Sequence, residues 1–295
     1  MKIRIGVGLG TTTSAAGDPA TFASLVDAAE SGGWDSLWLS ERLTTDAPDP
    51  IVALSFAAAR SDRLKLGTSV QVLPGRNPAS IAKQWASLDR LSGGRALPAF
   101  GLGVADPREQ AAFGVERGDR ARLFDDALPK LRAWWDGEEM DGVSIRPRPI
   151  QQPLDVWLGG MAPSELKRVG RMGDGWLPSF CTPDDIAEGK RVITEVARDH
   201  GRTIDDEHWG ALIIVADGPL PATLAGAIES RRPGLRTDDI VPTSPASLRI
   251  RVMEMIDAGA SKFVIVPVLD PSAGANSGWS RHLGAYGEAV LDLQT

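Results

Sequence analysis

Two glycine-rich segments carry the first chemical signal in this sequence. Gly101-Leu102-Gly103 and Gly159-Gly160-Met161 each follow a short apolar run, and the second leads into a segment with helical spacing. Glycine lets a backbone approach a bound group closely, and the N–H groups at the start of a helix favour an anion such as a phosphate. A tight turn between a strand and a helix would explain the same glycines without a ligand. Spacing alone leaves both interpretations open.

The side chains that usually perform catalysis do not group into a motif. His200, His208 and His282 lack the spacing of metal ligands, so we expect no metal site, and we expect His200 to end a helix. Cys181 is the only cysteine, cannot form a disulfide within the chain, and is expected to be a small apolar core residue. Because few acids and bases cluster, we expect a bound cofactor to supply the chemistry.

Short apolar runs alternate with segments of helical spacing along the chain. Asp18 and Asn77, each followed by proline, are typical helix starts, and Arg120–Trp135 is predicted to be a helix kinked at Pro129. Eight strands separated by helices are typical of a (β/α)8 TIM barrel, so we predict this α/β fold. The predicted strands are Ile3–Leu9, Ser36–Ser40, Leu64–Val72, Ala96–Leu102, Asp155–Leu158, Gly175–Pro178, Ala211–Ala216 and Lys262–Val266.

Two long intervals interrupt this rhythm. We expect a single helix and a proline-rich stretch between Gly103 and Asp155, and a polar insertion between Asp217 and Thr243. In a barrel the loops after strands carry function, so we predict loop insertions at the C-terminal mouth of one domain spanning residues 1–295. Pro98 falls within the predicted fourth strand, where proline removes a ladder hydrogen bond.

Composition excludes several classes of protein. The chain has 295 residues, 42% of them hydrophobic, and a net charge of −7, which argues against disorder and against a nucleic-acid partner. Its apolar runs are too short to span a membrane. We interpret Ile3–Leu9 as a first strand and not a signal peptide. We therefore expect a cytoplasmic enzyme with a small-molecule substrate, and a homodimer is the assembly we consider.

Several segments, in family order over residues 1 to about 180, resemble the bacterial luciferase-like superfamily. Within that superfamily the chain is similar to the shorter members that use the deazaflavin coenzyme F420, and less similar to the longer flavin monooxygenases. Asp257-Ala258-Gly259, before the last strand, also fits. The matching segments are Gly33–Arg42, Leu66–Val70 with Arg76–Ala79, Leu88–Arg95, Trp157–Gly160 and Gly173–Trp176.

The resemblance implies a barrel whose cofactor ring lies at the C-terminal mouth. It implies a cis peptide between Ser69 and Val70 that supports the ring, and an acidic contact from Glu41. Gly101 and Gly103 would let the ring approach the fourth strand. The residues implied to bind the cofactor are Glu41, Ser69, Val70, Gly101, Gly103, Gly159, Gly160, Met161 and Ser179, the last four near its phosphate tail.

The sequence departs from this family where the substrate would bind. Many deazaflavin enzymes have a histidine proton acceptor where Arg42 stands, and arginine stays protonated, so it cannot act as a base. A glutamate of the sugar-phosphate dehydrogenases is replaced by Val104, which argues against that activity. Arg42 is either a solvated residue pairing with Asp46 or Asp49, or a fixed cation that polarises a substrate carbonyl or holds an anionic group of the cofactor.

Three functions remain open at this point. The first is hydride transfer between F420 and a small organic substrate, with Glu41 and Arg42 as candidate catalytic residues and reduction of a carbonyl or unsaturated compound as the expected direction. The second is an FMN-dependent monooxygenase. The third is a cofactor-binding barrel without turnover, or a barrel that carries phosphates without redox chemistry.

Overall fold

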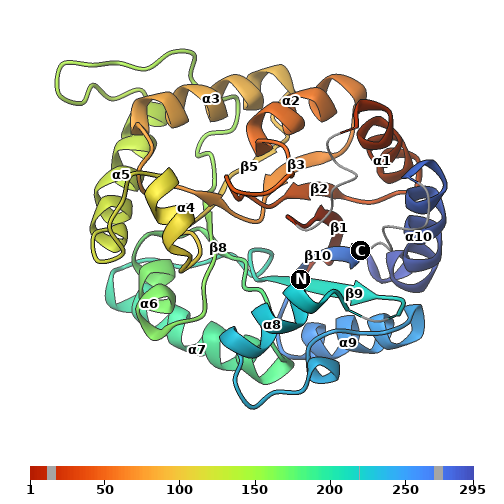
Figure 1. Ribbon diagram of the computed structural model, residues 1–295. Helices are drawn as coiled ribbons and strands as arrows, with labels where there is room; N and C mark the ends of the chain where they lie inside the picture. The colour runs from red at the N-terminus through yellow and green to blue at the C-terminus, as the bar shows by residue number, and fades with distance from the viewer. Residues whose placement is uncertain (12–17, 219, 269–274) are drawn as a thin grey trace.

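Parallel strands form the centre of the molecule and helices surround them (Figure 1). The computed structural model describes residues 1–11, 18–218, 220–268 and 275–295. The strands are β1 (Arg4–Leu9), β2 (Ser36–Leu39), β3 (Lys65–Thr68), β4 (Gln71–Val72), β5 (Ala96–Leu97), β6 (Ala99–Gly101), β7 (Trp157–Leu158), β8 (Gly175–Trp176), β9 (Gly210–Ala216) and β10 (Lys262–Val268). The helices are α1 (Pro19–Ser31), α2 (Pro50–Arg60), α3 (Pro78–Leu91), α4 (Pro107–Ala112), α5 (Arg120–Asp136), α6 (Pro163–Met172), α7 (Pro183–Asp199), α8 (Ala222–Arg231), α9 (Pro245–Asp257) and α10 (Ala275–Val290).

The strands close into a barrel, as predicted. One sheet runs β5-β3-β2-β1-β10-β9 and the other β4-β6-β7-β8, with every pair parallel. Parallel bridges from Trp176 to Trp209 and from Ser179 to Leu212 join the region of β8 to that of β9. On the other side, β3 and β4 are two parts of the predicted third strand, and β5 and β6 are two parts of the fourth. The barrel therefore has eight strand positions.

Two features of the backbone divide these strands. The Ser69–Val70 peptide, between β3 and β4, is cis, which confirms the prediction. Pro98 separates β5 from β6 and has no N–H to give to a neighbour. The hydroxyl of Thr68 compensates there, because it donates to Ala99 O at 2.7 Å and accepts from Ala99 N at 3.0 Å. A side chain thus completes the hydrogen bonding where the proline interrupts the ladder.

The predicted helix starts are confirmed at both positions. Asp18 accepts a hydrogen bond from Thr21 N at 2.8 Å, and Asn77 accepts one from Ser80 N at 3.0 Å, so each side chain caps its helix. His200 is the C-terminal cap of α7, also as predicted. Helix α5 continues through Pro129 as a single element.

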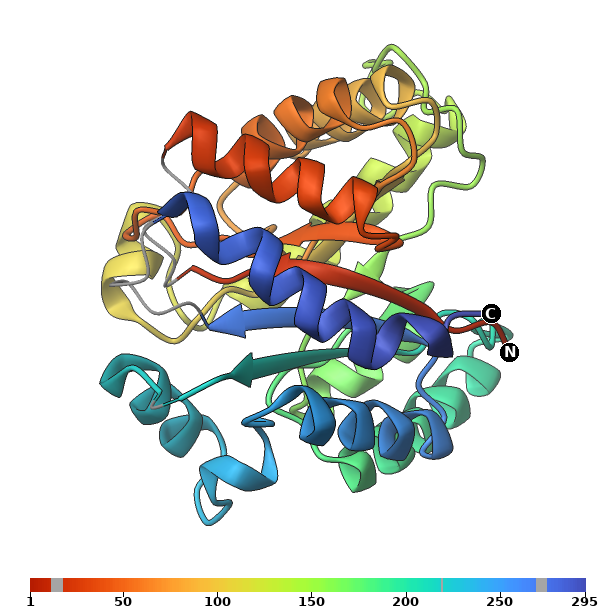
Figure 2. The ribbon, with the colours of Figure 1, turned by 90° about the vertical axis from the view of Figure 1, so that its right-hand side faces the viewer.

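The two long intervals contain more helix than the sequence suggested. The interval after Gly103 holds α4 as well as α5, so the prediction of a single helix there was wrong. The polar insertion after Asp217 contains α8, which was not predicted. Figure 2 shows α4 and α8 at the carboxyl ends of the strands and both chain termini at the opposite end. Both extra helices therefore lie at the mouth where insertions were expected.

Aromatic side chains fill the barrel beneath this mouth. The rings of Trp38 and Trp157 meet edge to face, with centroids 6.4 Å apart, and both are buried. Trp38 packs directly on the backbone of Gly67, where a Cβ would come within 2.4 Å of the ring. The interior is therefore a packed core below the mouth and leaves space only nearer the strand ends.

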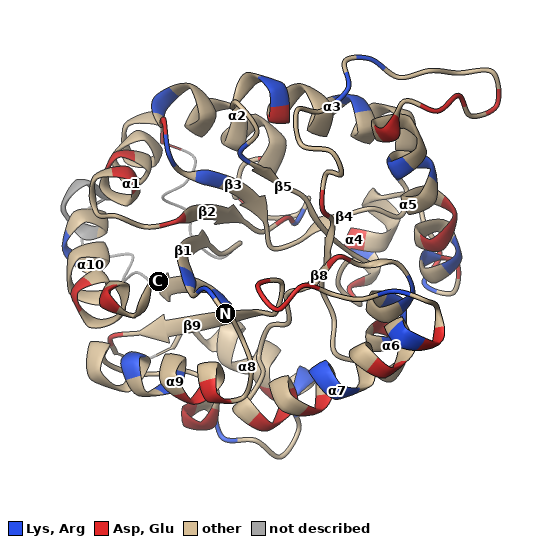
Figure 3. Cartoon of the chain, turned by 180° about the vertical axis from the view of Figure 1, so that it is seen from behind, with Lys and Arg blue, Asp and Glu red and all other residues tan. Residues whose placement is uncertain are grey.

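Charged residues of both signs are mixed around the outer helices (Figure 3). Within the part of the chain that the structure describes, no helix has the length and apolar character needed to cross a membrane.

Candidate functional site

A cavity of about 550 Å³ opens at the carboxyl ends of the strands. Its wall combines residues that follow β1, β2, β3, β6, β7 and β8 with residues of β4, β9, β10 and α8. Every site residue expected from the sequence lines it: Glu41, Arg42, Ser69, Val70, Gly101, Gly103, Gly159, Gly160, Met161 and Ser179. The fold thus brings together residues that are up to 138 positions apart in the chain.

Val70, which follows the Ser69–Val70 peptide, lines the cavity. A Cβ on Gly101 would lie 2.5 Å from one methyl group of Val70, and a Cβ on Gly159 would lie 3.1 Å from the other. Ser40 holds the preceding residue, because its hydroxyl donates to Ser69 O at 3.0 Å. Val70 therefore presents an apolar surface that packs on the neighbouring strand ends, which suits contact with a flat ring.

Glu41 is a buried carboxylate in the wall of the cavity. One oxygen accepts from Val72 N at 2.7 Å, and the other pairs with the guanidinium of Arg76. Burial raises the pKa of Glu41 to about 7, although Arg76 and the Val72 N–H act in the opposite direction. Glu41 can therefore hold or release a proton near neutral pH.

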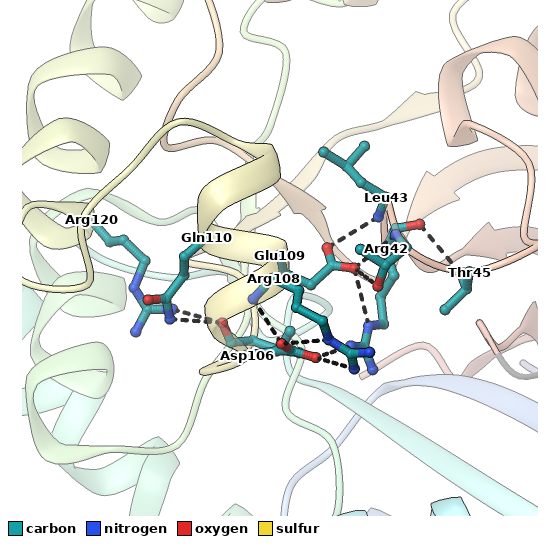
Figure 4. A network of polar contacts seen from close by, with 10 residues as sticks. Arg42, Leu43, Thr45, Asp106, Arg108, Glu109, Gln110 and Arg120 are labelled. Atoms are coloured by element: carbon teal, nitrogen blue, oxygen red, sulfur yellow. Dashed lines mark hydrogen bonds and ion pairs between the residues drawn. The ribbon is translucent and has the colours of Figure 1, made fainter.

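Arg42 is held by acidic residues of the loop that contains α4 (Figure 4). Its guanidinium contacts Asp106 at 3.1 Å and Glu109 at 3.6 Å. This corrects the alternative in which Arg42 pairs with Asp46 or Asp49, because the N-cap residue Asp106 and Glu109 of α4 lie over the loop after β2. Arg42 is thus a fixed cation at the cavity, with a third of its side chain exposed.

Glu109 holds the loop after β2 as well as the arginine. It is 3% exposed and accepts from Leu43 N at 3.1 Å and Thr44 N at 2.9 Å. Burial alone would raise the pKa of Glu109, but the hydrogen bonds from Thr44 and Leu43 and the charge of Arg42 together hold it below its ordinary value.

Arg120 organises the adjacent loop, because it donates to Gly103 O at 2.9 Å and Val104 O at 3.2 Å.

The segment from Gly159 to Met161 forms an anion-binding cradle at the start of α6. Gly160 has φ +102°, a conformation that favours glycine, and Met161 N and Ala162 N both point to one acceptor. That acceptor is Glu165 Oε2, 2.9 Å from each nitrogen. The cradle therefore fits an oxyanion, and here the oxyanion comes from the protein itself.

The other candidates of the sequence do not form a second site. Cys181 is buried, and burial raises the pKa of its thiol to about 12, so it remains protonated in the core. His200 contacts Val196 O, and His208 contacts Asp174 O. Among the residues described, no three His, Cys, Asp or Glu side chains lie together as metal ligands would.

Sequence reasoning missed the contribution of α8. Leu224, Arg231 and Arg232 line the cavity, and the guanidinium of Arg231 lies 5.1 Å from the centroid of the Phe180 ring. Arg232 pairs with Asp185 at 2.8 Å and donates to Phe180 O at 3.2 Å. Adjacent arginines inside an insertion at a barrel mouth are a signal that could have placed them at the cavity.

Several known proteins are similar to this chain in sequence. An F420-dependent glucose-6-phosphate dehydrogenase of Kineococcus radiotolerans is 30% identical over 178 residues, which cover 54% of this chain and 52% of that protein. The chain spans about half the length of the curated relatives it matches.

Two solved structures share the fold over nearly the whole chain. An F420-dependent secondary alcohol dehydrogenase with an F420–acetone adduct matches with a TM-score of 0.79 at 16% identity, over all of both chains. The oxygenating constituent of 3,6-diketocamphane monooxygenase from Pseudomonas putida, in complex with FMN, matches with a TM-score of 0.73 at 15% identity, over 98% of each chain. The family model of the luciferase-like monooxygenases matches residues 2–219. This chain therefore belongs to the luciferase-like monooxygenase family.

Proposed function

We propose that the chain is an oxidoreductase that uses F420 to reduce a carbonyl or unsaturated group of a small organic substrate. The observation that carries this proposal is the cavity itself. At the carboxyl ends of three strands it brings together the apolar surface of Val70, the cradle at Gly159–Met161 and the cation of Arg42. The relative from Kineococcus, which is named for F420, supports the choice of cofactor.

Each part of the cavity fits one part of such a cofactor. Val70 would support the ring, with Gly101 and Gly103 leaving room beside it, and Glu41 would contact its polar edge. The N–H groups of Met161 and Ala162 would hold the phosphate, with Ser179 nearby. When bound, reduced F420 supplies a hydride, which would pass to the carbonyl carbon of the substrate.

Arg42 favours reduction as the direction of the reaction. A guanidinium stabilises the negative charge that develops on a carbonyl oxygen when hydride arrives, and it cannot accept the proton that alcohol oxidation releases. Asp106 and Glu109 hold this cation in place, so little reorganisation is needed during the reaction. The substrate oxygen then takes its proton from water, which balances the step.

Val104 lines the cavity where the sugar-phosphate dehydrogenases have a glutamate. For this reason the proposal does not extend the sugar substrate of the Kineococcus relative to this chain. A small ketone, aldehyde or enone fits better with a wall that also contains Leu212, Ile214 and Leu224.

The proposal is tested by titrating the purified chain with F420 and with FMN and then mixing the reduced complex with a panel of ketones and enones. We expect F420 to bind more tightly and the reduced cofactor to be oxidised by at least one member of the panel. Tight binding of FMN without F420 would favour the second function, a flavin monooxygenase. Binding of F420 without any hydride transfer would favour a barrel without turnover.

A further inference from the structure

The carboxylate of Glu165 occupies the cradle in which a phosphate would lie. Its Oε2 atom is 2.9 Å from Met161 N and 2.9 Å from Ala162 N, and a Cβ on Gly160 would lie 2.5 Å from the same oxygen. Glu165 therefore lies directly over the backbone of Gly160. It is also one of the residues that line the cavity.

A phosphate and this carboxylate exclude each other. Both need the same two N–H groups, which are those of the N-cap residue Ala162 and of Met161 before it. Two anions at this distance would also repel each other. An anionic tail can use the cradle only after Glu165 has rotated away from it.

The cavity contains cations that could receive the displaced carboxylate. Arg231 lines the same wall, and Arg232 Nη1 lies 3.6 Å from Met161 Sδ, beside the cradle. Burial lowers the pKa of Arg231, and the charge of Glu165 opposes this shift. Glu165 and Arg231 therefore line the same cavity with opposite charges.

We propose that Glu165 is an internal competitor for the anionic tail of the cofactor, occupying the cradle when the site is empty and yielding it when a phosphate binds. This inference rests on the proposed function and adds a residue that sets how tightly the tail is held. If Glu165 were only a helix cap, its removal would lower the stability of the protein without improving the binding of a phosphate.

The two roles are separated by ligands that differ only in their tails. The first pair of ligands is FMN and riboflavin, and the second is F420 and its deazaflavin chromophore without the phosphate tail. We would measure the dissociation constant of each ligand for the parent chain, Glu165→Gln and Glu165→Ala. Glu195→Gln, an exposed change of the same charge on α7, is the matched control.

We expect both Glu165 variants to bind the phosphate-bearing ligands about tenfold more tightly, because like charge is removed from their site. The ligands without a phosphate should bind equally to all four proteins. Unchanged or weaker binding of FMN and F420 in both Glu165 variants would overturn the inference.

A second measurement does not depend on either cofactor. Without phosphate, Glu165→Ala should melt about 2–4 °C below the parent, because α6 loses its cap. Sodium phosphate, compared with sodium chloride at equal ionic strength, should raise the melting temperature of both Glu165 variants more than that of the parent. If neither F420 nor FMN binds, the proposed function fails, and the phosphate comparison alone decides the role of Glu165. An equal rise in melting temperature in all the proteins would then overturn the inference.

Discussion

Glu109 on α4 accepts a hydrogen bond from Thr44 N at 2.9 Å, and this contact joins the loop after β2 to the helix that follows β6. The same carboxylate lies 3.6 Å from Arg42 Nε. The position of the cation at the cavity thus depends on a short helix from another part of the chain. The roles of Arg42 and of Glu109 can therefore be tested by separate substitutions.

Replacing Arg42 should slow the chemical step while leaving the fold intact. We expect Arg42→Ala to reduce the rate of hydride transfer from the reduced cofactor about 10- to 100-fold, because a preorganised charge near the substrate is lost. Stopped-flow absorbance would give this rate, and a cofactor titration would show whether binding is unchanged. Arg108→Ala is the control, because Arg108 contacts the same Asp106 at 3.1 Å but is 80% exposed. A parent rate in Arg42→Ala would assign Arg42 to a structural role.

The raised pKa of Glu41 predicts how stability depends on pH. The folded protein keeps this proton up to about pH 7, whereas the unfolded chain releases it near 4.5. The buried charge therefore costs stability that is absent at pH 4.5 and complete above pH 7. Relative to Glu41→Gln, the free energy of unfolding of the parent should fall by about 1–3 kcal/mol over this range. Urea denaturation at several pH values would measure it, and parallel curves for the two proteins would contradict the prediction.

Glu109 should show the opposite sign, because its pKa is held below its ordinary value of 4.5. Its contribution to stability is present above pH 4.5 and is lost as the pH falls through its pKa in the folded protein. Glu109→Gln should therefore be about 1–3 kcal/mol less stable than the parent at pH 7, with the difference shrinking in acid. The same urea experiment serves, and a difference that grows in acid would show that the carboxylate charge is not what holds the loop.

The left-handed conformation of Gly160 predicts a local effect on the cofactor. A Cβ there is strained at φ +102° and crowds the cradle, so Gly160→Ala should weaken FMN or F420 binding about tenfold or more. Gly201→Ala has a similar backbone cost, at φ +66° with no heavy atom within 4 Å of its Cβ, but lies after α7 and away from the cavity. Both variants should lose about 1 kcal/mol of stability, and only Gly160→Ala should lose affinity. Equal affinities would place the phosphate elsewhere.

The hydroxyl of Thr68 should be needed for stability. Thr68→Val keeps the shape of the side chain but leaves Ala99 N–H and C=O without their partner, which should cost about 1–3 kcal/mol. Thr68→Ser retains the hydroxyl and should recover most of this loss. Chemical denaturation would compare the three proteins, and a Val variant as stable as the parent would mean that the break at Pro98 needs no such bond.

The strands could be predicted because each is a short run of apolar residues, and these runs recur at regular intervals along the chain. A strand that is buried in a barrel needs such a run. The helix α8 was missed for the converse reason, since only Leu224 and Ile228 of its residues are buried, too few to show a periodic apolar face. The partners of Arg42 could not be read from the sequence, because Asp106 and Glu109 lie 64 and 67 positions away. Their contact arises only when two loops meet at one end of the barrel.

The residues expected to line the cavity came from a family resemblance and not from periodicity or composition. The fold brings them together, because the residues after parallel strands meet at one end of the barrel. The contact of Glu165 with the cradle also depends on the fold. Glu165 follows Ala162, which is not a usual helix cap, so the sequence alone gave no reason to expect its carboxylate over Gly160.

The indole rings of Trp38 and Trp157 give the barrel an intrinsic fluorescent probe of cofactor binding. Both rings belong to the apolar cluster against which Val70 and Leu212 of the cavity wall pack. A flavin or deazaflavin at the mouth would absorb where tryptophan emits, so occupancy should be visible as quenched near-ultraviolet fluorescence without any label. Trp38→Phe would show how much of that signal arises beneath the mouth, since the chain has nine tryptophans in all.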